Sequence, residues 1–343
     1  MEEAVWTRVD AGHGVPLDLL TARFVHHRFA PHAHEEFSIG ACVEGVEVID
    51  YRGARHYTGP GSLVVIEPGE VHTGGAARPG GFAYSYPFAT PPSINGAKPA
   101  LSMGYMSGMV DGLTSGTNNQ ASWVGDGWDF TAGGYVERHF QSCSEDIGGN
   151  NPAPGTGDNC YAVENATLVL GGKSTELVKD KDSGKWVPKD DDGAKVEILT
   201  GAANNAWNGE YWKVTAQDGT QYFLGLNRLP GWSSGKPETQ SVWTVPVFSN
   251  NPPEPCYHEK FIDSHCDMAW RWNLDYTVDP NNNVTTYYYQ PETNYYGMNL
   301  NRQTAGTKYT AGGYPLRIEY GLHLDKVGPA GQQVDSVYAT DPA

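Results

Sequence analysis

Three histidines and a glutamate near the N-terminus are the residues whose types and spacing best suit chemistry. His32, His34 and Glu36 follow one another at intervals of two, and His72 comes shortly after Pro68-Gly69. Residues two apart on a β-strand point to the same face, so we expect the first three to share a face. His72, on a second hairpin, is expected to complete the set. Three imidazoles and a carboxylate would suit zinc, iron or manganese.

Short strands separated by glycine turns must position these side chains. From Phe37 onward the sequence reads FSIGACVEG, VEVIDYRG and ARHYTGPGSLVVIEPGEVHTGG, with a buried strand expected at Ser62 to Ile66. Closely spaced short strands of this kind predict a barrel or jelly roll.

The two histidine-bearing phrases carry a family resemblance. PHAHEEFSIG and GPGSLVVIEPGEVHTG resemble the N-terminal cupin domain of AraC-type transcription regulators, from about Trp6 to Tyr84. The resemblance implies a sensor of small ligands such as an arabinose-like sugar. The family continues with closing strands, dimerising helices and helix-turn-helix motifs, and we find no pattern for them downstream. We therefore predict a partial cupin domain over residues 1–84, with its DNA-binding part missing.

Three interpretations of the histidines stay open. In metal-binding cupins the glutamate lies further from the second histidine than Glu36 lies from His34. AraC-type sensors use the same face for a sugar without metal, and imidazole is also a common satisfied polar group. His32, His34, Glu36 and His72 are thus predicted to line a ligand pocket, to bind a divalent transition metal, or to be structural.

A different pattern begins near Tyr84, and its clearest element is the stretch Trp270 to Tyr289. Apolar and polar residues alternate up to Val278, Pro280 to Asn283 supply a turn, and a β-branched and aromatic run returns. This pattern predicts a hairpin. Its form Y-x-x-D-x-x-N-N-x-x-x-Y resembles a YD repeat of the Rhs family, whose secreted β shells wrap a cargo or present a surface.

Other phrases extend this resemblance over residues 85–343. They include YSYPFATPPSINGAKPALSMGYMSGMVDG, EYWKVTAQDGTQYFLGLNRLPGW and SVWTVPVF, which resemble the segment before the repeats in secreted actinobacterial Rhs-type proteins. Asp218-Gly219 between two alternating runs predicts a hairpin, and Ala166 to Leu170 with Ser174 to Val178 predicts another. The expected fold class is all-β: a partial cupin jelly-roll barrel followed by a larger, hairpin-rich Rhs-like sheet region.

Four of the five cysteines form two local pairs. Cys143 and Cys160 flank one loop, and Cys256 and Cys266 flank a shorter one. Local pairs in loop-rich β sequence predict two disulfides and an oxidising compartment, the alternative being four unrelated buried thiols. Cys42 is expected to be a small buried hydrophobic residue.

Charge and composition limit the partners. A net charge of -17 argues against nucleic acid, which needs a basic face. No apolar run is long enough for a transmembrane helix, and the start MEEAVWTRVDAGHG lacks the apolar core of a secretory signal. Gly231 to Gly235 fits G-x-S-x-G by letters, but Lys236-Pro237 prevents the helix that a hydrolase needs there. We expect no catalytic residues.

We therefore predict a non-catalytic binding or structural module, part of a secreted Rhs-type shell fused to a truncated sugar-sensing cupin. The partners would be a small sugar and the remainder of the shell. The alternatives are an AraC-type ligand-sensing domain without its DNA-binding part and a metal-dependent cupin enzyme. The Rhs-like part implies an extracellular location, and the cupin part implies a cytoplasmic location. The simplest account of this conflict is a hybrid, by gene fusion, a misassembled reading frame or artificial origin.

Overall fold

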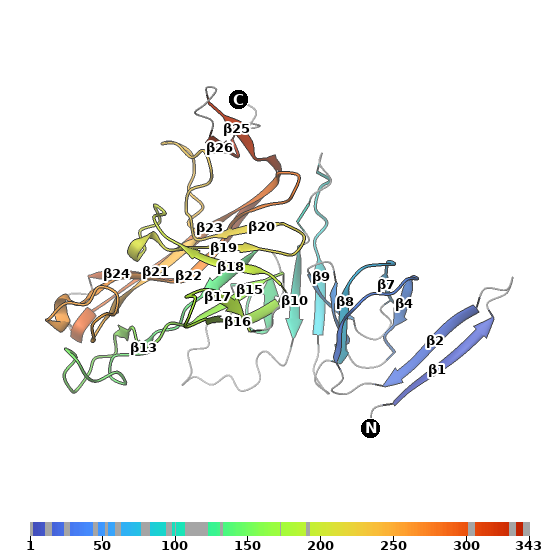
Figure 1. Ribbon diagram of the computed structural model, residues 1–343, viewed down its shortest axis with the longest axis horizontal. Coiled ribbons are helices and arrows are strands. Elements are labelled where there is room, and N and C mark those ends of the chain that lie inside the picture. Colours follow the sequence, from blue (N-terminus) through green and yellow to red (C-terminus); the bar gives the residue numbers. More distant parts are fainter. Residues whose placement is uncertain are drawn as a thin grey trace. The chain divides into compact units, whose positions relative to one another are not determined.

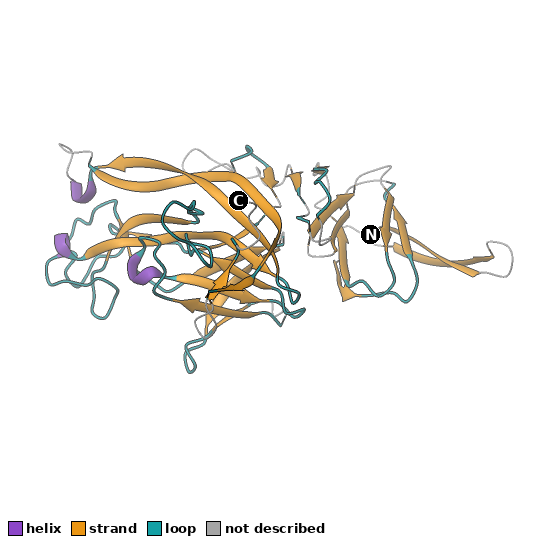
Figure 2. Cartoon of the chain, turned by 90° about the horizontal axis from the view of Figure 1, so that it is seen from above, coloured by secondary structure: helices purple, strands orange, loops and turns teal. Residues whose placement is uncertain are grey.

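The computed structural model shows an all-β protein, as the sequence predicts. It describes residues 3–10, 16–23, 28–43, 47–51, 54–58, 63–76, 83–93, 98–99, 101–106, 123–130, 133–171, 173–189, 193–300, 306–328 and 334–338. Strands dominate these residues, and the helical pieces that Figure 2 draws in purple are short 3-10 turns, at Trp207–Gly209, Phe261–Asp263 and Met298–Leu300.

The chain divides into two compact units. Unit 1 contains Met1–Ala89 and Ala100–Ala132, and unit 2 contains Thr90–Pro99 and Gly133–Ala343. The predicted boundary at residue 84 falls within strand β9 (Ala83–Pro87), which pairs with β10 (Ser102–Met106) in unit 1. The strand thus runs across that position, and the division into residues 1–84 and 85–343 stays a prediction.

Unit 1 is built from small antiparallel sheets. The four-stranded sheet has the order β3-β8-β5-β6, and a two-stranded sheet pairs β4 with β7. Two further sheets pair β1 with β2 and join β9, β10 and β11. The strand bounds are β1 Glu3–Asp10, β2 Pro16–Arg23, β3 Arg28–His32, β4 Ser38–Ala41, β5 Glu47–Tyr51, β6 Ala54–Thr58, β7 Leu63–Ile66, β8 His72–Ala76 and β11 Trp128–Phe130. Ile49 and Ile66 are its buried aliphatic side chains among the described residues.

Unit 2 contains a closed barrel. Strand β12 pairs with both β15 and β22, so the ladder β12-β15-β16-β17-β18-β19-β20-β22 returns to its start. Closure leaves these eight strands without a free edge, which stabilises a sheet of this size. The bounds are β12 Gly134–Glu137, β15 Ala166–Leu170, β16 Lys173–Lys179, β17 Trp186–Pro188, β18 Lys195–Leu199, β19 Tyr211–Thr215, β20 Gln221–Leu224 and β22 His265–Val278.

Inward-facing side chains fill this barrel. Alternate residues such as Val136, Leu168 and Val214 are buried together in one core. Three tryptophans stack edge to face at its centre, with ring centroids 5.5 Å apart for Trp186 and Trp212 and 5.9 Å apart for Trp212 and Trp272. The barrel interior is therefore packed core, as in other small barrels.

Long strands extend from the barrel. Strand β22 also pairs with β21 and β23, and β23 pairs with β24 along its whole length. Figure 1 draws β23 and β24 as long orange ribbons. The strands of unit 2 outside the barrel, short ones included, are β13 Gln141–Ser142, β14 Asn159–Cys160, β21 Val242–Phe248, β23 Asn283–Tyr296, β24 Thr307–His323, β25 Asp325–Val327 and β26 Val334–Ser336.

The three predicted hairpins of this region are confirmed. Strands β22 and β23 meet at the turn after Val278, where Asp279 Oδ1 accepts hydrogen bonds from the backbone N–H groups of Asn281 and Asn283. Asn282 takes a φ of 63°, which asparagine tolerates. The pairs β19–β20 and β15–β16 also form as expected. Local turn chemistry determines these pairings.

No helix among the described residues is long and apolar enough to cross a membrane.

Candidate functional site

The two strands that carry His32 and His72 place them side by side. The residues are register partners across β3 and β8, next to an irregularity in the pairing between Phe29 and His32. Their ring centroids lie 4.4 Å apart. His34 approaches both, at 5.0 Å from His32 and 5.1 Å from His72. One nitrogen from each ring lies within 4.8 Å of the other two, so three imidazoles converge on one point.

His34 reaches this point from a loop. Strand β3 ends at His32, and the His34 carbonyl accepts a hydrogen bond from the N–H of Gly69, 2.8 Å away, in the turn that leads to His72. Gly69 has a φ of 78°, which glycine adopts at little cost. This backbone bond ties the two histidine motifs together.

Glu36 lies outside the converging group. The expectation that His32, His34 and Glu36 share one strand face is wrong, because the strand ends at His32 and the period of two ends with it. Glu36 is exposed, and the group that the structure brings together holds the three histidines alone.

His72 is the buried member of the group, with 6% of its surface exposed. Its Nδ1 lies 3.1 Å from the carbonyl oxygen of Glu70. A carbonyl only accepts, so Nδ1 carries the proton and Nε2 keeps its lone pair for a ligand. Burial lowers the pKa of His72; the Glu70 carbonyl acts against this shift, and the nearby His32 and His34 add to it. The neutral imidazole that results is the form that binds metals.

Sequence reasoning missed two polar residues on the same face of this sheet. Tyr51 is the register partner of His72 on β5, and Glu47, four residues earlier, faces the same side as the buried Ile49. Burial raises the pKa of Glu47, while its hydrogen bond to Thr58 acts in the opposite direction. In the sequence VEVIDY, Glu47, Ile49 and Tyr51 stand at alternate positions. This alternation could have predicted that the three side chains share one face of the strand.

The arrangement suits two kinds of ligand. Three imidazoles within 4.8 Å form the nitrogen-rich, open set that a divalent transition metal takes. The same imidazoles, with Glu47 and Tyr51 on the neighbouring strand, offer donors and acceptors to a small polar molecule.

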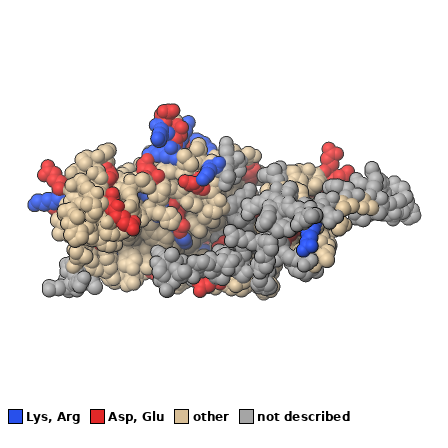
Figure 3. All heavy atoms as spheres, turned by 90° about the horizontal axis from the view of Figure 1, so that it is seen from below, with Lys and Arg blue, Asp and Glu red and all other residues tan. Residues whose placement is uncertain are grey.

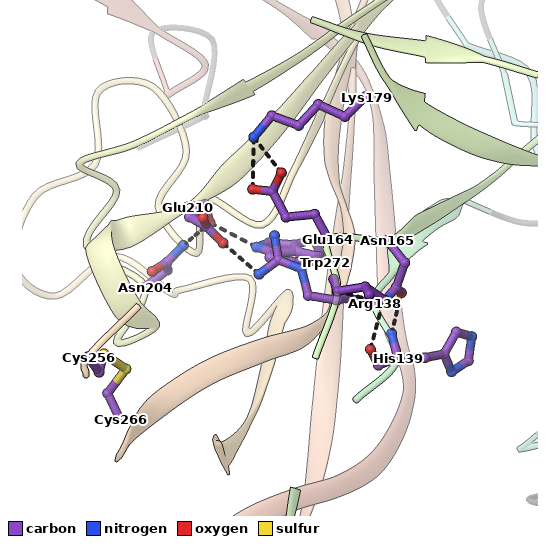
Figure 4. A network of polar contacts seen from close by, with 11 residues as sticks. Arg138, His139, Glu164, Asn165, Lys179, Asn204, Glu210, Cys256, Cys266 and Trp272 are labelled. Carbon is purple, nitrogen blue, oxygen red and sulfur yellow. Dashed lines mark hydrogen bonds and ion pairs between the residues drawn. A yellow bond between two sulfur atoms is a disulfide. The ribbon is translucent and has the colours of Figure 1, made fainter. Parts of the chain in front are cut away.

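A second polar cluster lies in unit 2, at one end of the barrel (Figure 4). The buried Arg138 donates from Nη1 to Glu210 Oε2 at 3.1 Å, and its guanidinium lies 4.9 Å from the Trp272 ring. Asn204 and the Trp272 indole both donate to the Glu210 carbonyl. The opposite charges of the pair cancel inside packed protein, so we assign this cluster to structure.

The predicted cysteine pairs lie at disulfide distance. Bonds join Cys143 to Cys160, 17 residues apart, and Cys256 to Cys266, 10 residues apart. Cys143 and Cys160 are fully buried against Phe248. Cys42 belongs to neither pair and is half-buried.

Charged side chains of both signs are scattered over the surface that Figure 3 shows, and acidic and basic groups lie next to each other where they gather. The described part of this face offers no broad basic patch of the kind that a duplex needs.

Comparisons with solved structures find a Tc holotoxin pore and an effector-protein domain among the similar chains. TcdB2-TccC3 has a TM-score of 0.36 and 16% identity, over 71% of this chain and 10% of that one. The N-terminal domain of effector protein SpvB from Salmonella typhimurium strain LT2 has a TM-score of 0.32 and 19% identity, over 69% and 64%. The Photorhabdus luminescens Tc holotoxin pore has a TM-score of 0.35 and 14% identity, over 88% and 10%. At these values the similarity says nothing about what this chain binds or does.

The chain thus spans about a tenth of TcdB2-TccC3 and less than two thirds of the SpvB domain. No curated protein sequence matches it significantly. Residues 14–86, which carry all three converging histidines, match the family model of the AraC-like ligand binding domain, as the two histidine motifs predict.

Proposed function

We propose that this protein is a non-catalytic binding module whose ligand site is the face formed by His32, His34 and His72. The observation that carries the proposal is the convergence of these three imidazoles within 4.8 Å, inside the segment that matches an AraC-like ligand binding domain. The neutral, oriented imidazole of His72 supports a role in binding.

Two ligands fit this face. The first is a small sugar of the arabinose kind. The family match and the additional polar groups of Glu47 and Tyr51 support this ligand. The second is a divalent transition metal. The close approach of one nitrogen from each of the three imidazoles supports this ligand. A resident metal would also bring a Lewis acid to the site, and this would favour a cupin enzyme.

For unit 2 we propose a structural role, as a segment of an exported Rhs-type β shell. Its barrel is filled by side chains, which supports a scaffold, and two disulfides support an oxidising compartment.

Isothermal titration calorimetry tests the binding proposal. Protein purified without chelator and freed of any tag is titrated with zinc chloride and with L-arabinose. We expect heat from one of the two ligands. We expect His72→Ala and His34→Ala to weaken that binding by about tenfold or more. His139→Ala, at an exposed histidine of unit 2, is the matched control and keeps it.

Circular dichroism confirms that each variant is folded before titration. Absence of heat with both ligands on folded wild-type protein would remove the proposal. Retention of full affinity in both folded variants would do so as well. Metal analysis of the same preparation separates a resident metal from an added one.

A further inference from the structure

An aromatic surface in unit 1 belongs to no site described so far. It lies on one face of the three-stranded sheet formed by β9, β10 and β11. Its members form two rows across the sheet, each made of three register partners: Tyr84, Tyr105 and Trp128 in one, and Tyr86, Met103 and Phe130 in the other. Opposite residues on paired strands share a face, and so do residues two apart along a strand. The two rows therefore form one continuous surface.

Two further rings extend this aromatic surface. The ring centroid of Phe88, the residue after β9, lies 5.3 Å from that of Tyr86 and 6.1 Å from that of Phe130. Trp123, in the segment before β11, lies 5.3 Å from Phe130. All three contacts are edge to face, with interplanar angles between 75° and 84°. Each ring restricts the orientation of its neighbours, so the surface is formed before any ligand arrives.

The aromatic surface is open to solvent. Tyr84 and Tyr86 are each 49% exposed, Trp123 is 50% exposed and Phe88 is 37% exposed. A ring that packs with one face and leaves the other face open exposes about half of its surface, and these fractions are close to that value. Single exposed aromatic residues are common in soluble proteins, whereas a contiguous exposed group marks a binding surface.

The chemistry of the surface favours an uncharged ligand with flat apolar faces and polar edges. None of its described side chains is charged at neutral pH, so a charged ligand would gain no ion pair there. Nucleic acid bases also stack on aromatic rings, but the net charge of -17 opposes a phosphate backbone. Tyrosine and tryptophan combine an apolar ring with one polar O–H or N–H group. A sugar ring is complementary to them, because its C–H groups form an apolar face and its hydroxyls lie at the edge.

The dimensions of the surface favour a chain of sugars over a single one. Tyr84, Tyr86 and Phe88 follow one another at intervals of two along β9, and at strand spacing they span about 13 Å. The three strands add a width of about 10 Å. Several rings in a row therefore have room on this face, and an extended chain matches a flat sheet better than a coiled one does.

We propose that this surface binds an uncharged, β-linked oligosaccharide. Its sugar rings would stack on Tyr84, Tyr86 and Trp123, and its hydroxyls would exchange hydrogen bonds with the phenol and indole groups of these side chains. A β-1,4-linked chain of glucose is extended and flat, so successive C–H faces can lie on one plane of aromatic rings. This site is separate from the histidine face, which is proposed to take a single small sugar or a metal.

Cellohexaose is the probe, and maltohexaose is the matched control, since it has the same six glucose units in a coiled, α-linked chain. Isothermal titration calorimetry of the full chain measures both affinities. We expect cellohexaose to bind at least about tenfold more tightly than maltohexaose, because only the flat chain can stack on several rings at once.

Trp123→Ala and Tyr86→Ala are each expected to weaken cellohexaose binding by about tenfold, through the loss of one stacking ring. Tyr295→Ala is the matched control, because Tyr295 is a tyrosine of β23 in unit 2 with 54% of its surface exposed. Thermal unfolding shows which variants are folded. Either variant of the aromatic surface alone decides the question.

Four results would overturn the proposal: no cellohexaose binding, equal affinity for the two hexasaccharides, a folded variant of the aromatic surface with wild-type affinity, or self-association that Trp123→Ala abolishes. Analytical ultracentrifugation detects the last of these, which would assign the surface to a second copy of the chain. None of the four bears on the histidine face, because His72→Ala is expected to leave cellohexaose binding unchanged.

Discussion

At the scale of single residues, burial decides what a polar side chain does. Asp275 is fully buried in unit 2 without a cationic partner among its hydrogen bonds. It accepts from the Leu226 and Asn227 N–H groups at 2.7 and 3.1 Å and from the Thr239 hydroxyl at 2.5 Å. Burial raises its pKa to about 6, although these hydrogen bonds act in the opposite direction.

This shift has a definite sign for stability. Since the folded pKa lies above the usual 3.8, the folded state binds the proton more tightly. Stability from Asp275 is therefore present below about pH 4 and is lost as pH rises toward about 6. The loss is on the order of a few kcal/mol.

We expect Asp275→Asn to remove this component of the pH dependence. Urea unfolding at pH 4.5 and pH 6.5 gives the difference in unfolding free energy for each protein. The wild type should lose more stability between the two values than Asp275→Asn does. Asp182→Asn, at an exposed position, should behave as the wild type. Identical pH dependence in wild type and Asp275→Asn would contradict the assignment.

At the scale of elements, a glycine lets the loop after β20 approach the barrel core. Gly225 has a φ of 88°, and a Cβ at this position would lie 2.2 Å from Cδ1 of the buried Trp272 ring. Gly235 has a similar φ of 95°, but a Cβ there would meet nothing within 4 Å. The two positions share backbone strain and differ in packing.

Gly225→Ala is expected to lower the unfolding free energy by about 2–4 kcal/mol, through overpacking added to backbone strain. Gly235→Ala should cost only about 1 kcal/mol, from strain alone. Chemical denaturation of both variants measures the difference. Equal losses would show that the Trp272 contact does not limit position 225.

At the same scale, a disulfide joins Cys143, the residue after β13, to Cys160 in β14. It closes a loop of 17 residues and lies fully buried. Replacing Cys143 and Cys160 together by serine should cost about 3 kcal/mol, because the unfolded chain regains the freedom of that loop. Intact-mass measurement with alkylation, before and after reduction, checks first that the wild type holds both bonds. Free thiols at these four positions after an oxidising preparation would contradict the assignment.

At the scale of the whole molecule, the two units differ in what holds them together. Both disulfides and the packed barrel belong to unit 2. In the described residues of unit 1, the buried aliphatic core is small. The units are therefore expected to respond differently to reductant and to ligand.

Differential scanning calorimetry should show two transitions. Reductant is expected to lower the midpoint of the unit 2 transition and to leave the unit 1 transition in place. The ligand of the histidine face should raise only the unit 1 midpoint, since a ligand stabilises the part that binds it. A single transition that shifts with both additions would show that the units unfold together.

Local sequence determined much of this fold. The hairpins at β15–β16, β19–β20 and β22–β23 follow from alternation and from glycine or asparagine at the turn, so neighbouring residues suffice to predict them. The two cysteine pairs follow from short spacing for the same reason. The histidine motifs also identified the converging trio His32, His34 and His72.

Only the tertiary structure decided the rest. Closure of the barrel joins Val136 to Trp272, and Leu229, Arg317 and Val337 meet at one pocket in unit 2. Such contacts depend on strand registers and packing across long stretches of chain, which no local pattern encodes. The position of Glu36 was also beyond prediction from local sequence. Strand β3 ends at His32, two residues before His34, and this end is determined by pairing with β8 and not by the spacing of the side chains.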